Sequence, residues 1–105
     1  MEIRYYVNVQ GRTPFKEWLQ TLKDHNAARR IAVRLYQAQE GNLGDFKSVG
    51  EAVQELRIDH GPGYRVYASR QGPVLLLLLC GSTKADQARA IKLAKAYLAD
   101  WRNRA

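Results

Sequence analysis

Apolar and polar residues alternate at the start of the chain, a pattern typical of a strand with one buried face. Over residues 1–9 the apolar positions are Ile3, Tyr5, Val7 and Val9. The side chains between them are mostly polar. We therefore expect a half-buried first strand over residues 1–9, with these four side chains facing the core.

Two helices are predicted next, from their start signals and from apolar residues at helical spacing. Thr13 supplies an N-cap and Pro14 a first helical residue, and the apolar residues that follow recur at i, i+3, i+4 and i+7. A second helix is expected over about 24–40, before Gly41, a typical C-terminal stop. The pair predicts an αα-hairpin. The polar, turn-rich residues 41–50 predict a loop.

Three strands and a helix complete the pattern. Residues 53–59 and 64–69 alternate and are separated by a Gly-Pro-Gly turn at 61–63. Residues 74–79 are all apolar, which predicts a central strand covered on both faces. A last helix is expected over about 84–101. The order β-α-α-β-β-β-α predicts a single α+β domain over the whole chain, an antiparallel meander packed by two N-terminal helices and one C-terminal helix.

Composition narrows the class of protein. The chain has 105 residues, of which 46% are hydrophobic, enough for one core. Its longest apolar run, 74–80, is far shorter than the roughly 20 residues that span a bilayer, and the N-terminus has no signal-peptide pattern. The sequence therefore predicts a soluble, cytoplasmic protein without membrane contact. The net charge of +7 favours a polyanionic partner.

Cysteine and histidine usage bears on cofactors. Cys80 is the only cysteine and ends the apolar run, which predicts a buried small side chain rather than a nucleophile. His25 and His60 have no further ligands at metal-binding spacing. We therefore expect neither a metal site nor a cofactor.

Strand register decides where the polar side chains of the predicted hairpin lie. If Leu56 and Ile58 share a face with Val66, then Ile58 lies opposite Val66 and Asp59 lies opposite Arg65, as a cross-strand ion pair. A slip of one residue would bury arginines, so this register is well specified. The other face of the hairpin, which no predicted helix obviously covers, then carries Glu55, Arg57, Arg65 and Tyr67.

These side chains suit RNA chemistry. The arginines, with Lys47 and Lys84 near the same surface, can grip a phosphate and stabilise charge that develops on it. Tyr67 can stack on an unstacked base. Glu55 can take a proton from a ribose 2′-hydroxyl, so that the substrate attacks its own phosphate without a metal. The ordinary alternative is a solvated strand face whose charges pair across strands.

Three arginines of the second predicted helix lie mostly off its apolar stripe: Arg29, Arg30 and Arg34. We therefore expect their side chains to be exposed to solvent or to a partner. They fit contact with ribosomal RNA, and they equally fit a role in solubility.

The hairpin sequence resembles a known family. Glu55-Leu56-Arg57-Ile58, the block Gly61-Pro62-Gly63-Tyr64-Arg65-Val66-Tyr67, and the leucine run to Cys80-Gly81 with Lys84 and Gln87 resemble the phage-derived killer-protein branch of the RelE/ParE toxins, a superfamily that includes HigB. The resemblance covers nearly the whole chain. It implies a RelE-like fold, cleavage of messenger RNA on the ribosome, and inhibition by a cognate helix-turn-helix antitoxin.

The resemblance also implies residue roles. Related toxins hold the scissile phosphate with an arginine at the position of Arg65, helped by basic residues such as Lys84, and some use a carboxylate placed like Glu55 as base. A Gly-Ser-Thr-Lys stretch at 81–84 replaces the Gly-Gly-Asp-Lys frequent in the branch, and the general acid stays unassigned. Two alternatives remain open: a ParE-like inhibitor of DNA gyrase that cuts no RNA, and an inactive relic.

Overall fold

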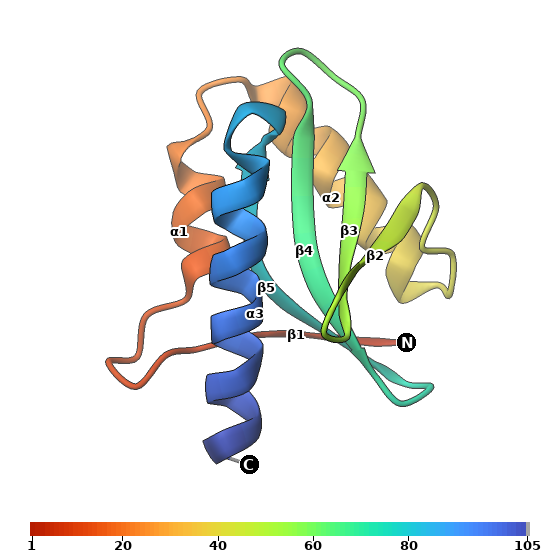
Figure 1. Cartoon of the computed structure of the whole chain (residues 1–105). Coiled ribbons are helices and arrows are strands. Elements are labelled where there is room, and N and C mark those ends of the chain that lie inside the picture. Colours follow the sequence, from red (N-terminus) through yellow and green to blue (C-terminus); the bar gives the residue numbers. More distant parts are fainter. Residues whose placement is uncertain (105) are drawn as a thin grey trace.

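The computed structural model describes residues 1–104 and has one five-stranded sheet with the order β1-β5-β4-β3-β2 (Figure 1). β1 runs parallel to β5, and all other neighbours are antiparallel. The elements are β1 (Glu2–Tyr5), α1 (Pro14–Thr21), α2 (His25–Gln39), β2 (Phe46–Gly50), β3 (Val53–Ile58), β4 (Tyr64–Gln71), β5 (Leu75–Thr83), the 3-10 turn η1 (Lys84–Asp86) and α3 (Gln87–Arg104). The predicted α+β class is confirmed, and the topology is consistent with a RelE-like fold.

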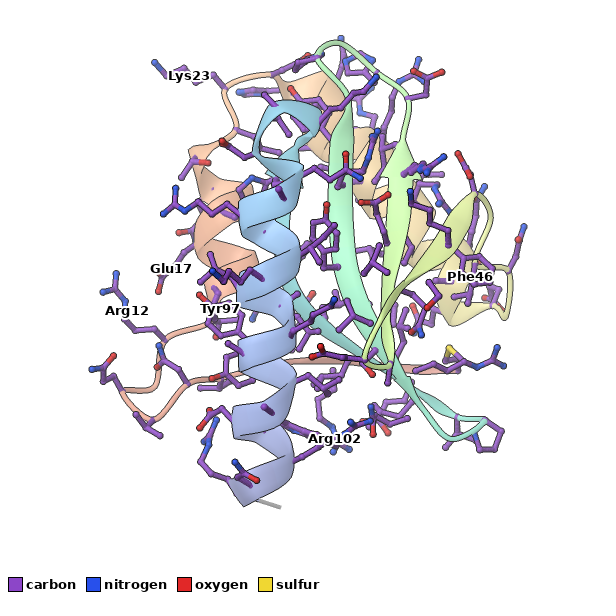
Figure 2. All side chains as sticks on the ribbon, viewed as in Figure 1. Arg12, Glu17, Lys23, Phe46, Tyr97 and Arg102 are labelled. Atoms are coloured by element: carbon purple, nitrogen blue, oxygen red, sulfur yellow. The ribbon has the colours of Figure 1, made fainter. Side chains whose placement is uncertain are left out.

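The helices form layers on both faces of the sheet, with α1 and α2 on one side and α3 on the other (Figure 1). Side chains fill the space between α3 and the sheet (Figure 2). The leucines of β5 alternate between the two cores: Leu76 and Leu78 pack with α1 and α2, and Leu77 and Leu79 pack with α3. The prediction of a central strand buried on both faces is therefore confirmed, and it explains why this strand has no polar side.

The predicted loop at 41–50 is wrong in its second half, because residues 46–50 form the edge strand β2, paired with β3. Every residue of β2 except Val49 is exposed. A strand with no buried face has no reason to alternate apolar and polar residues. The periodic pattern therefore gave no sign of it.

The first strand is shorter than predicted and ends at Tyr5. Val7 and Val9, expected in the core, are 42% and 73% exposed, whereas Tyr6 is 2% exposed. The chain leaves the sheet at Tyr6, whose ring stacks on Tyr97 of α3 and whose hydroxyl donates a hydrogen bond to Asp100. Ile3 packs in the core beneath α1 and α2, whereas Tyr6 faces the opposite side and is buried because α3 covers that side.

The register of β3 on β4 differs from the predicted one by two residues. Leu56 lies opposite Val66 and Ile58 opposite Tyr64. The turn sets this register, because the N–H of Gly63 donates to the carbonyl of His60 and closes the chain there. A shift of two residues leaves each side chain on the same face. The faces were therefore predicted correctly and the partners were not.

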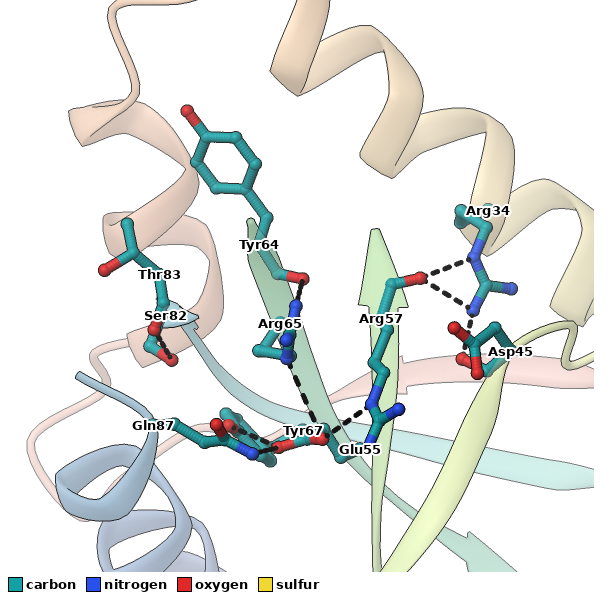
Figure 3. Close-up of polar contacts among 10 residues, drawn as sticks. All are labelled: Arg34, Asp45, Glu55, Arg57, Tyr64, Arg65, Tyr67, Ser82, Thr83 and Gln87. Carbon is teal, nitrogen blue, oxygen red and sulfur yellow. Dashed lines mark hydrogen bonds and ion pairs between the residues drawn. The ribbon is translucent and has the colours of Figure 1, made fainter. Parts of the chain in front are cut away.

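Arg34 ties α2 to the edge of the sheet (Figure 3). Its guanidinium donates to the main-chain carbonyls of Leu43 at 2.6 Å, Asp45 at 2.8 Å and Arg57 at 3.3 Å. Gly44 lies so close that a Cβ there would be 2.2 Å from Nη1 of Arg34. Burial lowers the pKa of Arg34, an effect that the charge of Asp45 opposes. Arg34 therefore has a structural role, and its predicted contact with RNA stays a prediction.

None of the helices within residues 1–104 combines the length and the hydropathy needed to cross a bilayer.

Replacement of Arg34 by glutamine is expected to lower the free energy of unfolding by about 2 kcal/mol, because three carbonyls lose a charged donor. Urea denaturation measures this change. Arg30→Gln is the matched control, since Arg30 lies on the same helix but is exposed, and we expect it to stay within about 0.5 kcal/mol of the unchanged protein. Equal losses in the two variants would contradict the structural role of Arg34.

Candidate functional site

Three of the predicted site residues meet at one end of the β3–β4 hairpin. Arg57 on β3 and Arg65 on β4 are direct cross-strand neighbours, and Lys84 follows β5. All three line a cavity of about 350 Å³. The rest of its lining comes from Asp45, Asp59, Gly61, Pro62 and Gly63.

The carboxylate of Glu55 contacts both arginines (Figure 3). Its Oε1 accepts a hydrogen bond from Nε of Arg57 at 3.2 Å and lies 3.8 Å from Nε of Arg65. Its Oε2 accepts from the hydroxyl of Tyr67 at 2.9 Å and from Nε2 of Gln87, at the start of α3, at 2.7 Å. We call these five residues the Glu55 cluster.

The Glu55 carboxylate is charged although it is fully enclosed. Burial by itself raises the pKa of Glu55, but the hydrogen bonds from Tyr67, Arg57 and Gln87 and the nearby charge of Lys47 outweigh burial, so that the pKa is lowered. Burial and the hydrogen bond to Glu55 both raise the pKa of Tyr67. Tyr67 is therefore a neutral donor to a carboxylate anion.

This arrangement leaves the outer nitrogens of the arginines available. Each Nε faces Glu55, and of the four Nη atoms only Nη1 of Arg65 has a hydrogen-bond partner within residues 1–104, the carbonyl of Tyr64 at 3.1 Å. The side chain of Arg57 is 36% exposed and that of Arg65 is 11% exposed. The Arg57 guanidinium is thus hydrogen-bonded at Nε, the Arg65 guanidinium is ion-paired there, and both line the cavity, an arrangement that suits an oxyanion.

Two predicted roles do not fit this geometry. Tyr67 is 0% exposed and cannot stack on a base, because α3 covers this part of the sheet face. Glu55 is also 0% exposed and cannot take a proton directly from a substrate. The expectation that no helix covers the face was wrong: α3 packs over its inner part and leaves only the end of the hairpin open.

The remaining predicted residues, Lys47, Arg29 and Arg30, do not line this cavity. Lys47 is exposed on β2, directly opposite Glu55. Arg29 and Arg30 are exposed on α2 and line a second cavity, of about 410 Å³, which shares Arg57 and Asp59 with the first. Their contact with RNA stays a prediction.

Sequence reasoning missed Gln87, Asp45 and Asp59 as members of the site. Gln87 sits at the start of α3, and no local pattern shows that a helix start will reach a residue on β3. Asp59 was assigned to an ion pair with Arg65 that the true register does not form. Within the part of the chain that the structure describes, no group of three or more His, Cys, Asp or Glu side chains is placed to share a metal ion.

Cys80 is buried, as predicted. Burial raises the pKa of its thiol to about 12, so the thiol stays protonated.

Glu55→Gln is expected to lower the free energy of unfolding at pH 7 by about 3 kcal/mol, because two guanidinium groups lose their buried counter-charge. The pKa of Glu55 is lower in the folded protein than its ordinary value of 4.5. The stabilisation is therefore complete above pH 4.5 and is lost as the pH falls through the folded-state pKa. Urea unfolding at pH 7 and pH 3 should show the difference between wild type and variant shrinking in acid.

The exposed Glu51→Gln is the control for this experiment and should leave stability nearly unchanged at both pH values. A constant difference between wild type and Glu55→Gln across this pH range would show that Glu55 is not the charged anchor.

The chain was compared with known protein families and with individual proteins. No protein-family model matches the chain. An uncharacterized protein of Haemophilus influenzae is 45% identical over 89 residues, which cover 85% of this chain and 90% of that protein. An identity of this size over nearly the full length of both proteins shows common descent. The chain therefore belongs to the same family as this Haemophilus influenzae protein.

Proposed function

We propose that the chain is the toxin of a toxin–antitoxin pair in the RelE/ParE superfamily and that it cleaves messenger RNA. One observation supports this most strongly: two guanidinium groups, both ion-paired with the same buried carboxylate, line one cavity together with Lys84. The resemblance of the hairpin sequence to killer-protein toxins points to the same residues.

The cavity suits a phosphodiester. Arg57 and Arg65 offer Nη donors from neighbouring strands, and guanidinium donors match the spacing of phosphate oxygens. Because Glu55 fixes both side chains, little conformational entropy is lost when the phosphate binds. The same fixed donors stabilise the additional negative charge that develops on phosphorus during the reaction.

The proposed reaction uses a nucleophile that RNA itself carries. The ribose 2′-hydroxyl attacks the adjacent phosphorus, the bond from phosphorus to the 5′ oxygen breaks, and a 2′,3′-cyclic phosphate and a 5′-hydroxyl result. Arg57, Arg65 and Lys84 bind and neutralise the phosphate. DNA lacks the 2′-hydroxyl and is not a substrate.

Two partners complete the proposal: messenger RNA on the ribosome, and a helix-turn-helix antitoxin that inhibits the toxin. The net charge of +7 supports binding to ribosomal RNA. Arg29 and Arg30 line the second cavity together with Arg57, and so extend the basic surface from the end of β3 to α2.

Arg65→Ala is expected to abolish growth inhibition and to reduce cleavage of cellular messages at least ~100-fold, because a preorganised donor to the phosphate is lost. Primer extension on transcripts after induction measures the cleavage. Arg70→Ala is the matched control, since Arg70 lies on the same strand but is exposed and does not line the cavity; it should cleave like wild type. Arg65→Lys, which keeps the charge but loses the fork of donors, should also be impaired, and circular dichroism checks that each variant folds.

The same induction separates the competing functions. Cuts within translated codons support the nuclease. A DNA-damage response without cleaved messages would contradict the ribonuclease and support gyrase inhibition. Normal growth with intact messages would indicate an inactive relic. Unchanged cleavage by a folded Arg65→Ala protein would remove the cavity from the mechanism.

A further inference from the structure

The burial of Glu55 leaves the proposed reaction without a proton acceptor. A general base has to reach the 2′-hydroxyl, and Glu55 is 0% exposed and bonded on both oxygens. The cavity lining contains two other carboxylates, Asp45 and Asp59, and both are exposed. Within residues 1–104, neither carboxylate forms an ion pair or a hydrogen bond.

Asp59 lies on one side of a gap whose other side is Lys84. The paired register ends at Ile58 and Tyr64, so Asp59 and Gly63 are the next residues on the two chains. Lys84 adjoins Gly63, because its N–H donates to the Gly63 carbonyl at 2.9 Å. Asp59 and Lys84 thus lie on either side of a position without a side chain, and both line the same cavity.

Gly63 keeps this gap open, and Arg65 lies at its base. A Cβ on Gly63 would be 3.3 Å from Cβ of Lys84 and 3.5 Å from Nη1 of Arg65. The φ of Gly63, +83°, also favours glycine. A phosphate in the gap would contact Arg65, with the carboxylate of Asp59 on one side and the ammonium of Lys84 on the other.

We propose that Asp59 and Lys84 are the general base and general acid of this site, an inference that rests on the proposed ribonuclease function. The Asp59 carboxylate takes the proton of the 2′-hydroxyl as the oxygen bonds to phosphorus. Lys84 gives a proton to the 5′ oxygen as its bond to phosphorus breaks. Water then returns the proton of Asp59 to solvent and reprotonates Lys84, so that both groups are restored.

The chemistry of the cations identifies the acid. Three cations line the cavity: Arg57, Arg65 and Lys84. A guanidinium does not give up its proton in proteins, whereas an ammonium does. Lys84 is therefore the one cation of this lining that can protonate a leaving group. Its place beside Gly63, away from Asp59, fits a displacement in which the attacking and leaving oxygens lie on opposite sides of phosphorus.

Asp45 fits the role of base less well. It precedes β2, beyond Arg57, and its main-chain carbonyl accepts hydrogen bonds from the N–H of Arg57 and from Arg34. Its charge acts on the guanidinium of Arg34, outside the gap between Asp59 and Lys84. Glu51→Gln is the control for Asp59→Asn, because Glu51 is an exposed carboxylate that does not line the cavity.

The test uses purified protein and ribosomes programmed with a short synthetic message. Asp59→Asn is expected to cut at least ~100-fold more slowly than wild type, and Glu51→Gln within a few-fold of wild type. Lys84→Arg keeps the positive charge but cannot release a proton, so it too should slow at least ~100-fold. Circular dichroism and thermal unfolding confirm that the variants are folded.

A second substrate separates the two roles. A message with sulfur in place of the 5′ oxygen at the cut site has a leaving thiolate that needs no proton. It should restore cleavage by Lys84→Arg and leave Asp59→Asn slow. Cleavage by Asp59→Asn at the wild-type rate, or failure of the sulfur substrate to restore Lys84→Arg selectively, would overturn the assignment while the ribonuclease function stands. Absence of cleavage by the wild-type protein itself would overturn the ribonuclease function, and this inference with it.

Discussion

The carboxylate of Glu55 is buried on the sheet face beneath α3, where an ionised group is stable only if donors surround it. The desolvation of such a group costs roughly several kcal/mol. Donors from β3, β4 and α3 offset this cost, because Arg57, Arg65, Tyr67 and Gln87 all face the carboxylate. One side chain thus joins the strand pair to the start of the C-terminal helix. An apolar replacement of similar volume would pack against α3, but it would not orient the arginines.

The contacts of Glu55 with Nε of Arg57 and Arg65 connect this packing with the proposed chemistry, because they orient the two guanidinium groups. A free surface arginine samples many rotamers, and ordering it on a ligand costs entropy. Here the ordering is part of folding, because Glu55 holds Arg57 and Arg65 before any phosphate arrives. A preorganised donor also needs no rearrangement as charge develops on phosphorus. The buried acid, predicted as a base, therefore contributes more as a positioning residue.

The sequence predicted those features of the fold that depend on which side chains are buried. The alternation of β3 and β4 gave the correct face for Glu55, Arg57, Arg65 and Tyr67, and the unbroken leucine run gave the central strand β5. It missed what depends on contacts between distant segments. β2 has no buried face and therefore no periodic pattern. Tyr6 is buried because it packs on Tyr97 of α3. Arg34 donates hydrogen bonds to carbonyls on a loop nine to eleven residues away and on β3.

The register of the hairpin shows why faces are easier to predict than chemistry. Burial of apolar side chains distinguishes only odd shifts from even ones, because side chains alternate with a period of two. The choice among even shifts belongs to the turn at 60–63, where the hydrogen bond from Gly63 to His60 closes the chain. The predicted register would have neutralised Asp59 with Arg65. The observed register sets Arg65 beside Arg57, brings Tyr67 to Glu55, and leaves Asp59 next to a glycine. The turn, which buries almost nothing, thus decides which carboxylate is an anchor and which is free to accept a proton.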